Sequence, residues 1–225
     1  MNNEDKVSVK ELYKYPEHSK AYGYLSGFKF PWEALSGLKD FILTFGKELP
    51  KDLYTEIKEN VWVAKSAVIA PTASLNGPCI IGERTEVRQC AFIRGSVIIG
   101  DDCVIGNSCE FKNAVIFDSC QVPHFNYVGD TVMGYKSHMG AGSITSNVKS
   151  DKTPVKVRVG DTVIETGRKK FGAMLSDYVE VGCNSVLNPG TVIGTNTNIY
   201  PLSSVRGYVE PDSIFKREGN VVKKV

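Results

Sequence analysis

Residues 79–111, CIIGERTEVRQCAFIRGSVIIGDDCVIGNSCEF, carry an apolar side chain at every sixth position. The same period runs without a miss through a longer series: Val63, Ile69, Leu75, Ile81, Val87, Ile93, Ile99, Ile105, Phe111 and Phe117. A period of six fits neither the 3.6-residue turn of an α-helix nor the simple alternation of a half-buried strand. Short strands joined by tight corners, with one large and one small side chain buried per hexad, describe a parallel β-helix of hexapeptide repeats.

The pattern resumes further along the chain, first at Met133, Met139 and Thr145 and then from Leu175 to Val205. We therefore predict an all-β protein with one solenoid over residues 61–210, interrupted by loops near 122–130 and 148–170. The alternative, a sandwich of short strands, should show turns every 8–12 residues and strands of variable length.

The flanking segments differ in character from the repeats. Residues 1–60 include PWEALSGLKDFILTFGKEL (31–49), where Pro31 and apolar residues at helical spacing predict one helix. We expect this extension to cap the open end of the solenoid, whose unpaired backbone needs a cover. The tail, residues 211–225, is either a short hairpin around Gly219 or a loose end.

Composition excludes several classes of protein. A net charge of +2 is low for a nucleic-acid binder of this size. No run of about 18 apolar residues is present, and the first residues lack the apolar segment of a signal peptide, so we expect a cytoplasmic protein with no membrane partner. The six cysteines form no CxxC pair and no metal-ligand spacing with histidine, which predicts no metal site and no disulfide framework.

Two cations are expected to stack on one face. If three hexads make one coil, residues 18 apart lie above one another, and Arg94 and Lys112 have this spacing. Two adjacent cations repel unless an anion lies nearby, so they indicate a phosphate-sized site. The alternative is a pair of solvated surface charges. His124 lies where the repeat breaks. A histidine on a loop there either has a function or only makes hydrogen bonds within the loop.

These residues also match a known family. From Arg94 to Asn147 the chain resembles the acetyltransferase domain of the bacterial and archaeal glucosamine-1-phosphate N-acetyltransferases, which form left-handed β-helices and assemble as trimers. The resemblance lies in the spacing of Arg94, Lys112, His124, Tyr127, Gly129–Asp130 and GAGSITSN (140–147). The segment 152–194 looks most like the archaeal branch.

The resemblance implies a set of roles. His124 is the general base, and acetyl-CoA is the co-substrate, with no metal required. The substrate-binding residues are Arg94, Lys112, Tyr127, His138, Asn147 and either Lys149 or Lys152; the coenzyme groove between subunits is lined by Ala141, Gly142, Cys183 and Pro201. His138 departs from the family, which usually has Asn there. We expect a backbone N–H of the GAGS turn, such as that of Ala141, to stabilise the oxyanion of the collapsing thioester.

Three functions compete at this point. The first is acetyl transfer to a hexosamine 1-phosphate, with glucosamine 1-phosphate as the expected acceptor in amino-sugar nucleotide biosynthesis. The second is acetyl transfer to another amino sugar or to a nucleotide-linked one. The third is a non-catalytic scaffold for a separate nucleotidyltransferase, because only 60 residues precede the solenoid and no glycine-rich nucleotide loop occurs in them. For the same reason we expect no pyrophosphorylase activity.

Overall fold

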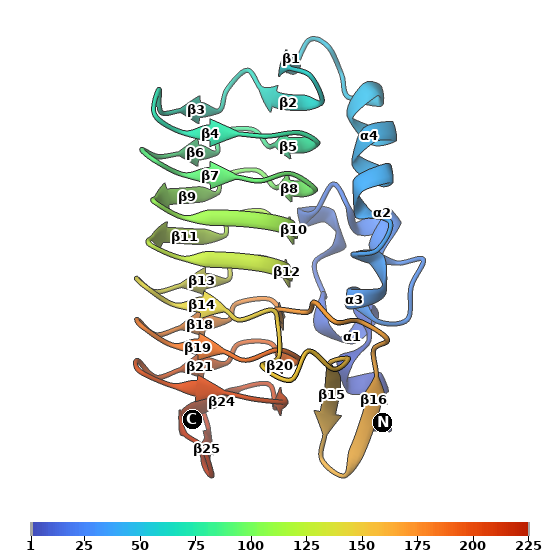
Figure 1. The fold of residues 1–225 in the computed structure, drawn as a ribbon, viewed down its shortest axis with the longest axis vertical. Helices are drawn as coiled ribbons and strands as arrows, with labels where there is room; N and C mark the ends of the chain where they lie inside the picture. The colour runs from blue at the N-terminus through green and yellow to red at the C-terminus, as the bar shows by residue number, and fades with distance from the viewer. Residues whose placement is uncertain (1, 225) are drawn as a thin grey trace.

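Short parallel strands stack in three columns along the long axis of the molecule, as Figure 1 shows. The computed structural model describes residues 2–224. Each strand pairs with the strands one coil above and below, so that Cys79 lies beside Val97. The apolar residues of the hexads point inward: Ile81, Ile99 and Ile105 are each 0% exposed. The predicted parallel β-helix is confirmed.

The columns are defined by their strands. The first contains β2 (Val61–Ala64), β5 (Cys79–Ile81), β8 (Val97–Ile99), β17 (Ala173–Leu175), β20 (Thr191–Ile193) and β23 (Tyr208–Val209). The second contains β3 (Val68–Ile69), β6 (Glu86–Val87), β9 (Val104–Asn107), β11 (Gln121–His124), β13 (His138–Met139), β18 (Glu180–Val181), β21 (Asn198–Ile199) and β24 (Ser213–Arg217). The third contains β4 (Ser74–Leu75), β7 (Phe92–Ile93), β14 (Ile144–Thr145), β19 (Val186–Leu187) and β22 (Ser204–Val205), and two longer strands, β10 (Glu110–Ile116) and β12 (Tyr127–Met133), pass from the third column into the first.

Two corners of the solenoid are one residue shorter than the repeat predicts. Ile93 pairs with Phe111, 18 residues on, but Ile99 pairs with Ile116, only 17 residues on. The corner at Asn113 is therefore one residue short, and the corner at Asp130 in the next coil is short in the same way. Phe117, which we expected inside the coil, therefore lies just past the buried strand position.

Phe117 still has a packing role. It is fully buried, and its ring lies 5.0 Å from that of Tyr13 in the N-terminal segment. The expected hexad register thus fails at this residue because the corner before it is short.

The expected loop at 122–130 is wrong. β11 and β12 run through this stretch, and only the corner Phe125–Asn126 separates them. Asn126 is buried there, and its Nδ2 donates to the carbonyl oxygens of Gly140 (2.8 Å) and Ser143 (2.9 Å). The apparent break around His124 is a shift of phase caused by the short corners.

The second interruption does leave the solenoid. After β14 the chain forms an antiparallel hairpin of β15 (Lys156–Val159) and β16 (Thr162–Glu165), then rejoins the first column at β17. Val155, Val157, Val159 and Ile164 are buried, which holds the hairpin against the coils. We call residues 148–170 the insertion.

The helical part of the N-terminal segment lies along the side of the solenoid (Figure 1), so the expected cap over the open end is limited to β1 (Tyr54–Lys58), the last strand of residues 1–60. Its elements are two 3₁₀ turns, η1 (Asp5–Val7) and η2 (Pro16–His18), and four helices, α1 (Val9–Leu12), α2 (Tyr22–Leu25), α3 (Pro31–Ala34) and α4 (Leu38–Glu48). The single helix predicted over 31–49 is thus split in two, with a break at residues 35–37. α4 packs against β5 and β8, and α3 against β12.

The two ends of the solenoid are closed by antiparallel strands. β1 (Tyr54–Lys58) pairs with β2 and covers the edge of the first coil. β24 continues the second column beyond residue 210, and it forms a hairpin around Gly219 with β25 (Asn220–Lys223). None of the helices in residues 2–224 has the length and apolar character that crossing a membrane requires.

Asp177 ties the N-terminal segment to a corner of the solenoid and should make stability depend on pH. Its fully buried carboxylate accepts hydrogen bonds from the backbone N–H groups of Lys14 (2.7 Å) and Tyr135 (2.8 Å). Burial raises the pKa of Asp177 to about 6, although the two N–H donors oppose the change. Because this value lies above the ordinary one of about 3.9, the contribution to stability is complete below about pH 4 and is lost as the pH rises through about 6.

We expect the native chain to lose up to about 3 kcal/mol of unfolding free energy relative to Asp177→Asn between about pH 4 and pH 7. Urea denaturation of both proteins at each pH measures the difference. A difference that stays constant with pH would mean that the carboxylate is ionised throughout.

Candidate functional site

Polar side chains gather at the corner between the third and first columns. We call them the Asp130 cluster: Arg94, Glu110, Lys112, Asn113, Tyr127, Asp130 and Asn147. The pairing of Ile93 with Phe111 places Arg94 directly above Lys112, as the 18-residue spacing predicts. Three successive coils and the return from β14 therefore supply the cluster.

Asp130 is the centre of this cluster. It occupies the short corner with a φ of 50°, and it is only 2% exposed. Its Oδ1 accepts from Asn113 Nδ2 (2.8 Å) and its Oδ2 accepts from Asn147 Nδ2 (2.6 Å). Lys112 Nζ lies 3.5 Å from Oδ2. A buried carboxylate needs such partners, so Asp130 fixes where the lysine and the two amides lie.

Tyr127 remains a hydrogen-bond donor at neutral pH. Its hydroxyl oxygen accepts from Asn147 Nδ2 at 3.0 Å. Burial raises the pKa of Tyr127, Asp130 and Glu110 raise it further, and Arg94 opposes them. The phenolic O–H is therefore available to a ligand oxygen.

Each of the two stacked cations has a carboxylate partner. Arg94 Nη1 lies 2.6 Å from Glu110 Oε1, and this contact raises the pKa of the guanidinium. Lys112 faces Asp130. The side chain of Arg94 is 44% exposed and that of Lys112 is 27% exposed, so both cations remain accessible at the surface, and an anionic ligand would join a network of alternating charges.

Arg168 is a member of this region that the sequence did not reveal. Burial lowers the pKa of its guanidinium, and nearby Asp130 partly offsets this. Its Nε donates to the carbonyl oxygen of Lys170 (3.3 Å) and its Nη1 to the hydroxyl of Ser36. The insertion thus returns a third cation to the neighbourhood of Asp130. The run RKK before Phe171 was the only sequence signal for it.

His124 is the last residue of β11 and lies at the corner that leads from the second column into the third. It belongs to what we call the corner column, which runs in backbone register through Asn107, His124, Ala141, Cys183 and Pro201. The hydrogen bonds from Phe125 N to Asn107 O (2.9 Å), from Gly142 N to His124 O (3.0 Å), from Asn184 N to Ala141 O (2.8 Å) and from Leu202 N to Cys183 O (2.9 Å) fix this order. The residues implied for the base and for the coenzyme groove therefore share one exposed edge.

Two backbone donors on this edge are free. Within residues 2–224, neither Ala141 N–H nor Cys183 N–H makes a hydrogen bond. The His124 imidazole also makes none within this part of the chain, and the structure joins it by no polar contact to Arg94, Lys112 or Tyr127. One chain thus presents two candidate half-sites: a corner with the His124 imidazole and free N–H groups, and a cluster with cations.

The remaining predicted residues lie elsewhere. His138 is on the second column, where its Nδ1 lies 2.8 Å from Glu180 Oε2 beside a hollow of about 490 Å³ that Lys136 and Tyr178 also line. Lys149 and Lys152 are both in the insertion. Lys149 pairs with Asp151 (3.2 Å), whereas Lys152 is exposed and has no ion pair within the described residues. A further hollow, of about 520 Å³, lies between α4 and β1, and no residue of either half-site lines it.

Known proteins are similar to the chain over most of its length. Residues 75–166 match the family described as the GMPPB C-terminal domain. The chain is 29% identical over 225 residues to the bifunctional protein GlmU of Methanococcus vannielii, a match that covers 95% of this chain and 53% of that protein. It is 31% identical over 174 residues to YaiX, an uncharacterized acetyltransferase of Escherichia coli, covering 69% of this chain and 74% of that one.

The chain belongs to the hexapeptide-repeat acyltransferase family. A further relative, 35% identical over 126 residues, is a bifunctional sugar-1-phosphate nucleotidylyltransferase/acetyltransferase of Sulfurisphaera tokodaii, with 56% of this chain and 31% of that protein covered. The chain spans about half the length of the archaeal GlmU proteins that it matches. As a hexapeptide acyltransferase it therefore corresponds to one part of those longer proteins.

Proposed function

We propose that this hexapeptide acyltransferase moves the acetyl group of acetyl-CoA to the amine of a hexosamine 1-phosphate, with glucosamine 1-phosphate as the preferred acceptor. His124 is the general base. Arg94, Lys112, Tyr127 and Asn147 hold the sugar phosphate. Ala141, Gly142, Cys183 and Pro201 line the path of the coenzyme.

The observation that carries this proposal is the pairing of the two half-sites on one strand. β12 begins three residues after His124 and leads directly to Asp130, so the same segment carries the base at one end and the cation cluster at the other. A small acceptor that carries an amine and a phosphate could place the amine at His124 and the phosphate at the cations of the Asp130 cluster. The shared edge of His124 and Ala141 further supports the reaction, because a free N–H lies next to the base in backbone register.

The chemistry follows from these groups. The amine nitrogen attacks the carbonyl carbon of the thioester, and His124 takes the proton that the nitrogen loses. The Ala141 N–H donates to the oxygen that becomes negative. The carbon–sulfur bond then breaks, and the coenzyme leaves as a thiol after regaining a proton. Neutral imidazole suits this task near neutral pH.

We also propose that the protein works as a homotrimer. The exposed corner column offers only one wall to a long coenzyme, and a second copy packed against the flat solenoid would supply the other. His138, whose ring faces Glu180 on the second column, would then approach the acceptor held by a neighbouring copy.

Release of free thiol from acetyl-CoA with a panel of acceptors tests the proposal. The panel is glucosamine 1-phosphate, galactosamine 1-phosphate, glucosamine without phosphate and a nucleotide-linked amino sugar. Turnover with the first and little with unphosphorylated glucosamine is the expected result. Turnover with another acceptor alone would change the substrate, and no turnover with any acceptor would favour a scaffold that partners a nucleotidyltransferase.

Arg94 gives a sharper prediction about the phosphate. We expect Arg94→Gln to raise KM for the phosphorylated acceptor about 10-fold, because one charge-assisted contact to phosphate is lost, while KM for acetyl-CoA stays unchanged. Arg88→Gln is the matched control, since Arg88 forms a similar exposed pair with Glu86 at 2.9 Å on the second column. Equal KM values in the two variants would remove Arg94 from the phosphate site.

A further inference from the structure

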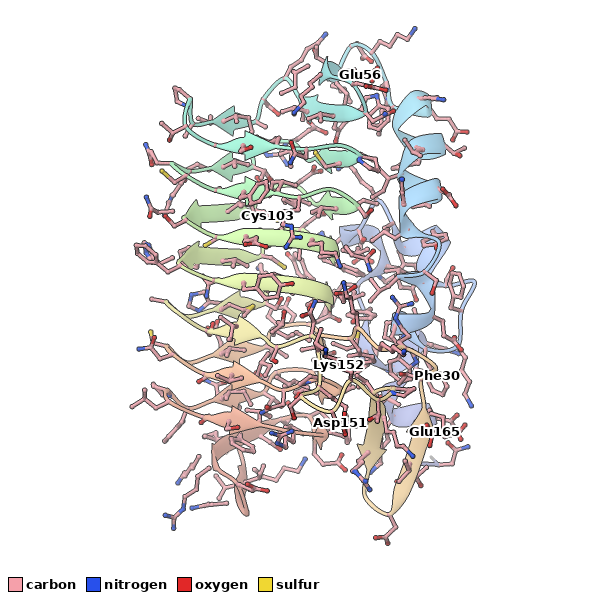
Figure 2. The ribbon with its side chains drawn as sticks, viewed as in Figure 1. Phe30, Glu56, Cys103, Asp151, Lys152 and Glu165 are labelled. Carbon is pink, nitrogen blue, oxygen red and sulfur yellow. The ribbon has the colours of Figure 1, made fainter. Side chains whose placement is uncertain are left out.

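The insertion is strongly basic compared with the rest of the chain. Residues 148–170 hold seven Lys and Arg residues against three Asp and Glu, whereas the full chain has a net charge of only +2. Figure 2 shows Asp151 and Lys152 on the stretch that leads into the hairpin and Glu165 on β16. The positive charge of this region is thus held beside the lower coils of the solenoid.

β15 presents its cations from a fixed position. Val155, Val157 and Val159 are buried, and Lys156 and Arg158 alternate with them on the exposed side. The backbone of β15 also lies close to corners of the solenoid: a Cβ added to Gly190 would come within 2.6 Å of Lys156 O, and one at Gly207 within 3.3 Å of Arg158 O. Packing and close approach together hold this strand in place.

Four cations from three separate segments meet here. A hollow of about 240 Å³, which we call the basic hollow, is lined by Lys149, Lys156, Arg158, Pro189, Arg206 and Gly207. No carboxylate is among these lining residues. Lys156 pairs with Glu165 (2.6 Å) and Lys149 with Asp151 (3.2 Å), but Arg158 and Arg206 have no ion pair within residues 2–224.

We propose that the basic hollow is a binding site for a diphosphate group. The planar guanidinium groups of Arg158 and Arg206 match the geometry of phosphate oxygens, and the two lysines add point charges. A single phosphate would bind one guanidinium group, whereas two linked phosphates would bind both arginines. The small volume suits a diphosphate better than a complete sugar nucleotide, whose remaining parts would extend outside.

The two arginines of the basic hollow do not belong to the Asp130 cluster, although Lys149 of the hollow comes two residues after Asn147 of the cluster. Arg206 shares the corner of Lys112, but the strand pairing places Gly129, Ser146 and Asn188 between them. Four strand spacings amount to about 19 Å. The proposal therefore does not depend on the acetyl acceptor, and a binding readout separates the two.

Calorimetric titration of the full chain with pyrophosphate tests the site. We expect saturable binding that weakens as salt is raised, and phosphate or sulfate should bind at least 10-fold more weakly. Arg158→Gln/Arg206→Gln should reduce pyrophosphate affinity at least 10-fold. Lys216→Gln/Arg217→Gln, which removes the same charge from exposed positions on β24, is the matched control.

Competition then identifies the source of the diphosphate. Coenzyme A and UDP-N-acetylglucosamine each contain one, and displacement of pyrophosphate by either assigns the site to that molecule. Equal weakening in both double variants, or equal affinity for pyrophosphate and sulfate, would overturn the proposal. Thermal melting of each variant confirms that the chain is folded, so a loss of binding reports on the hollow itself.

Discussion

Replacing His124 with asparagine is expected to lower kcat by about 10²- to 10⁴-fold, the usual contribution of a general base. The side chain is exposed and makes no hydrogen bond within the described residues, so the substitution should leave the melting temperature unchanged. KM for acetyl-CoA should also stay the same, because the proposed role of the imidazole is to take a proton from the amine of the acceptor. Steady-state thiol release with saturating acceptor measures the effect.

The pH profile distinguishes a base from a mere contact. Without His124, the rate depends on how much of the amine is already unprotonated, so the activity of the variant should climb with pH and the gap to the native enzyme should narrow. Activity within a few-fold of the native value at every pH would exclude His124 as the base. If the variant is slower than the native enzyme by the same factor at every pH, His124 only positions the acceptor.

Gly106→Ala is expected to be the most damaging small substitution in the solenoid. Gly106 lies in β9 opposite Pro123 of β11, and an added Cβ would collide with the backbone carbonyl of Pro123. A backbone atom in a paired strand cannot move aside as a flexible side chain can. We expect the free energy of unfolding to fall by about 3 kcal/mol or more.

Urea denaturation measures the effect, and Gly23→Ala is its control. Gly23 lies in α2, where an added Cβ would meet nothing within 4 Å. The control should match or exceed the native stability, because alanine favours a helix over glycine. A loss of less than about 1 kcal/mol in Gly106→Ala would mean that β9 and β11 can separate at little cost. Activity should fall with stability, since Pro123 precedes His124.

The fold could be predicted because buried positions in a solenoid must repeat. Ile81 and Ile99 occupy the same place in successive coils, and the sequence shows this directly. The short corners could not be predicted in the same way. Ile116 and Phe117 are both apolar, so the pattern continues for one more hexad in the wrong phase, and the error becomes a false loop around His124.

The two half-sites differ in how visible they are in a sequence. Arg94 and Lys112 are separated by one full coil, so their stacking follows from the period. Asp130 becomes a centre of the site only when two shortened corners bring it to Asn113 and Asn147. Arg168 arrives through a hairpin whose path depends on packing of alternate valines against the coils. The strict alternation from Val155 to Val159 was a usable signal for that strand.

The course of the N-terminal segment has a consequence for how the molecule comes apart. The segment runs back along the stack: Gly46 lies against Trp62 of the first coil, Lys20 pairs with Asp101 (2.6 Å), and Lys6 pairs with Glu210 (2.7 Å) near the last. Linear repeat arrays ordinarily fray from their ends, since each unit touches only its neighbours. Here, unfolding either terminal coil also removes contacts of the N-terminal segment, which the middle coils share. Thermal unfolding should therefore be a single cooperative transition.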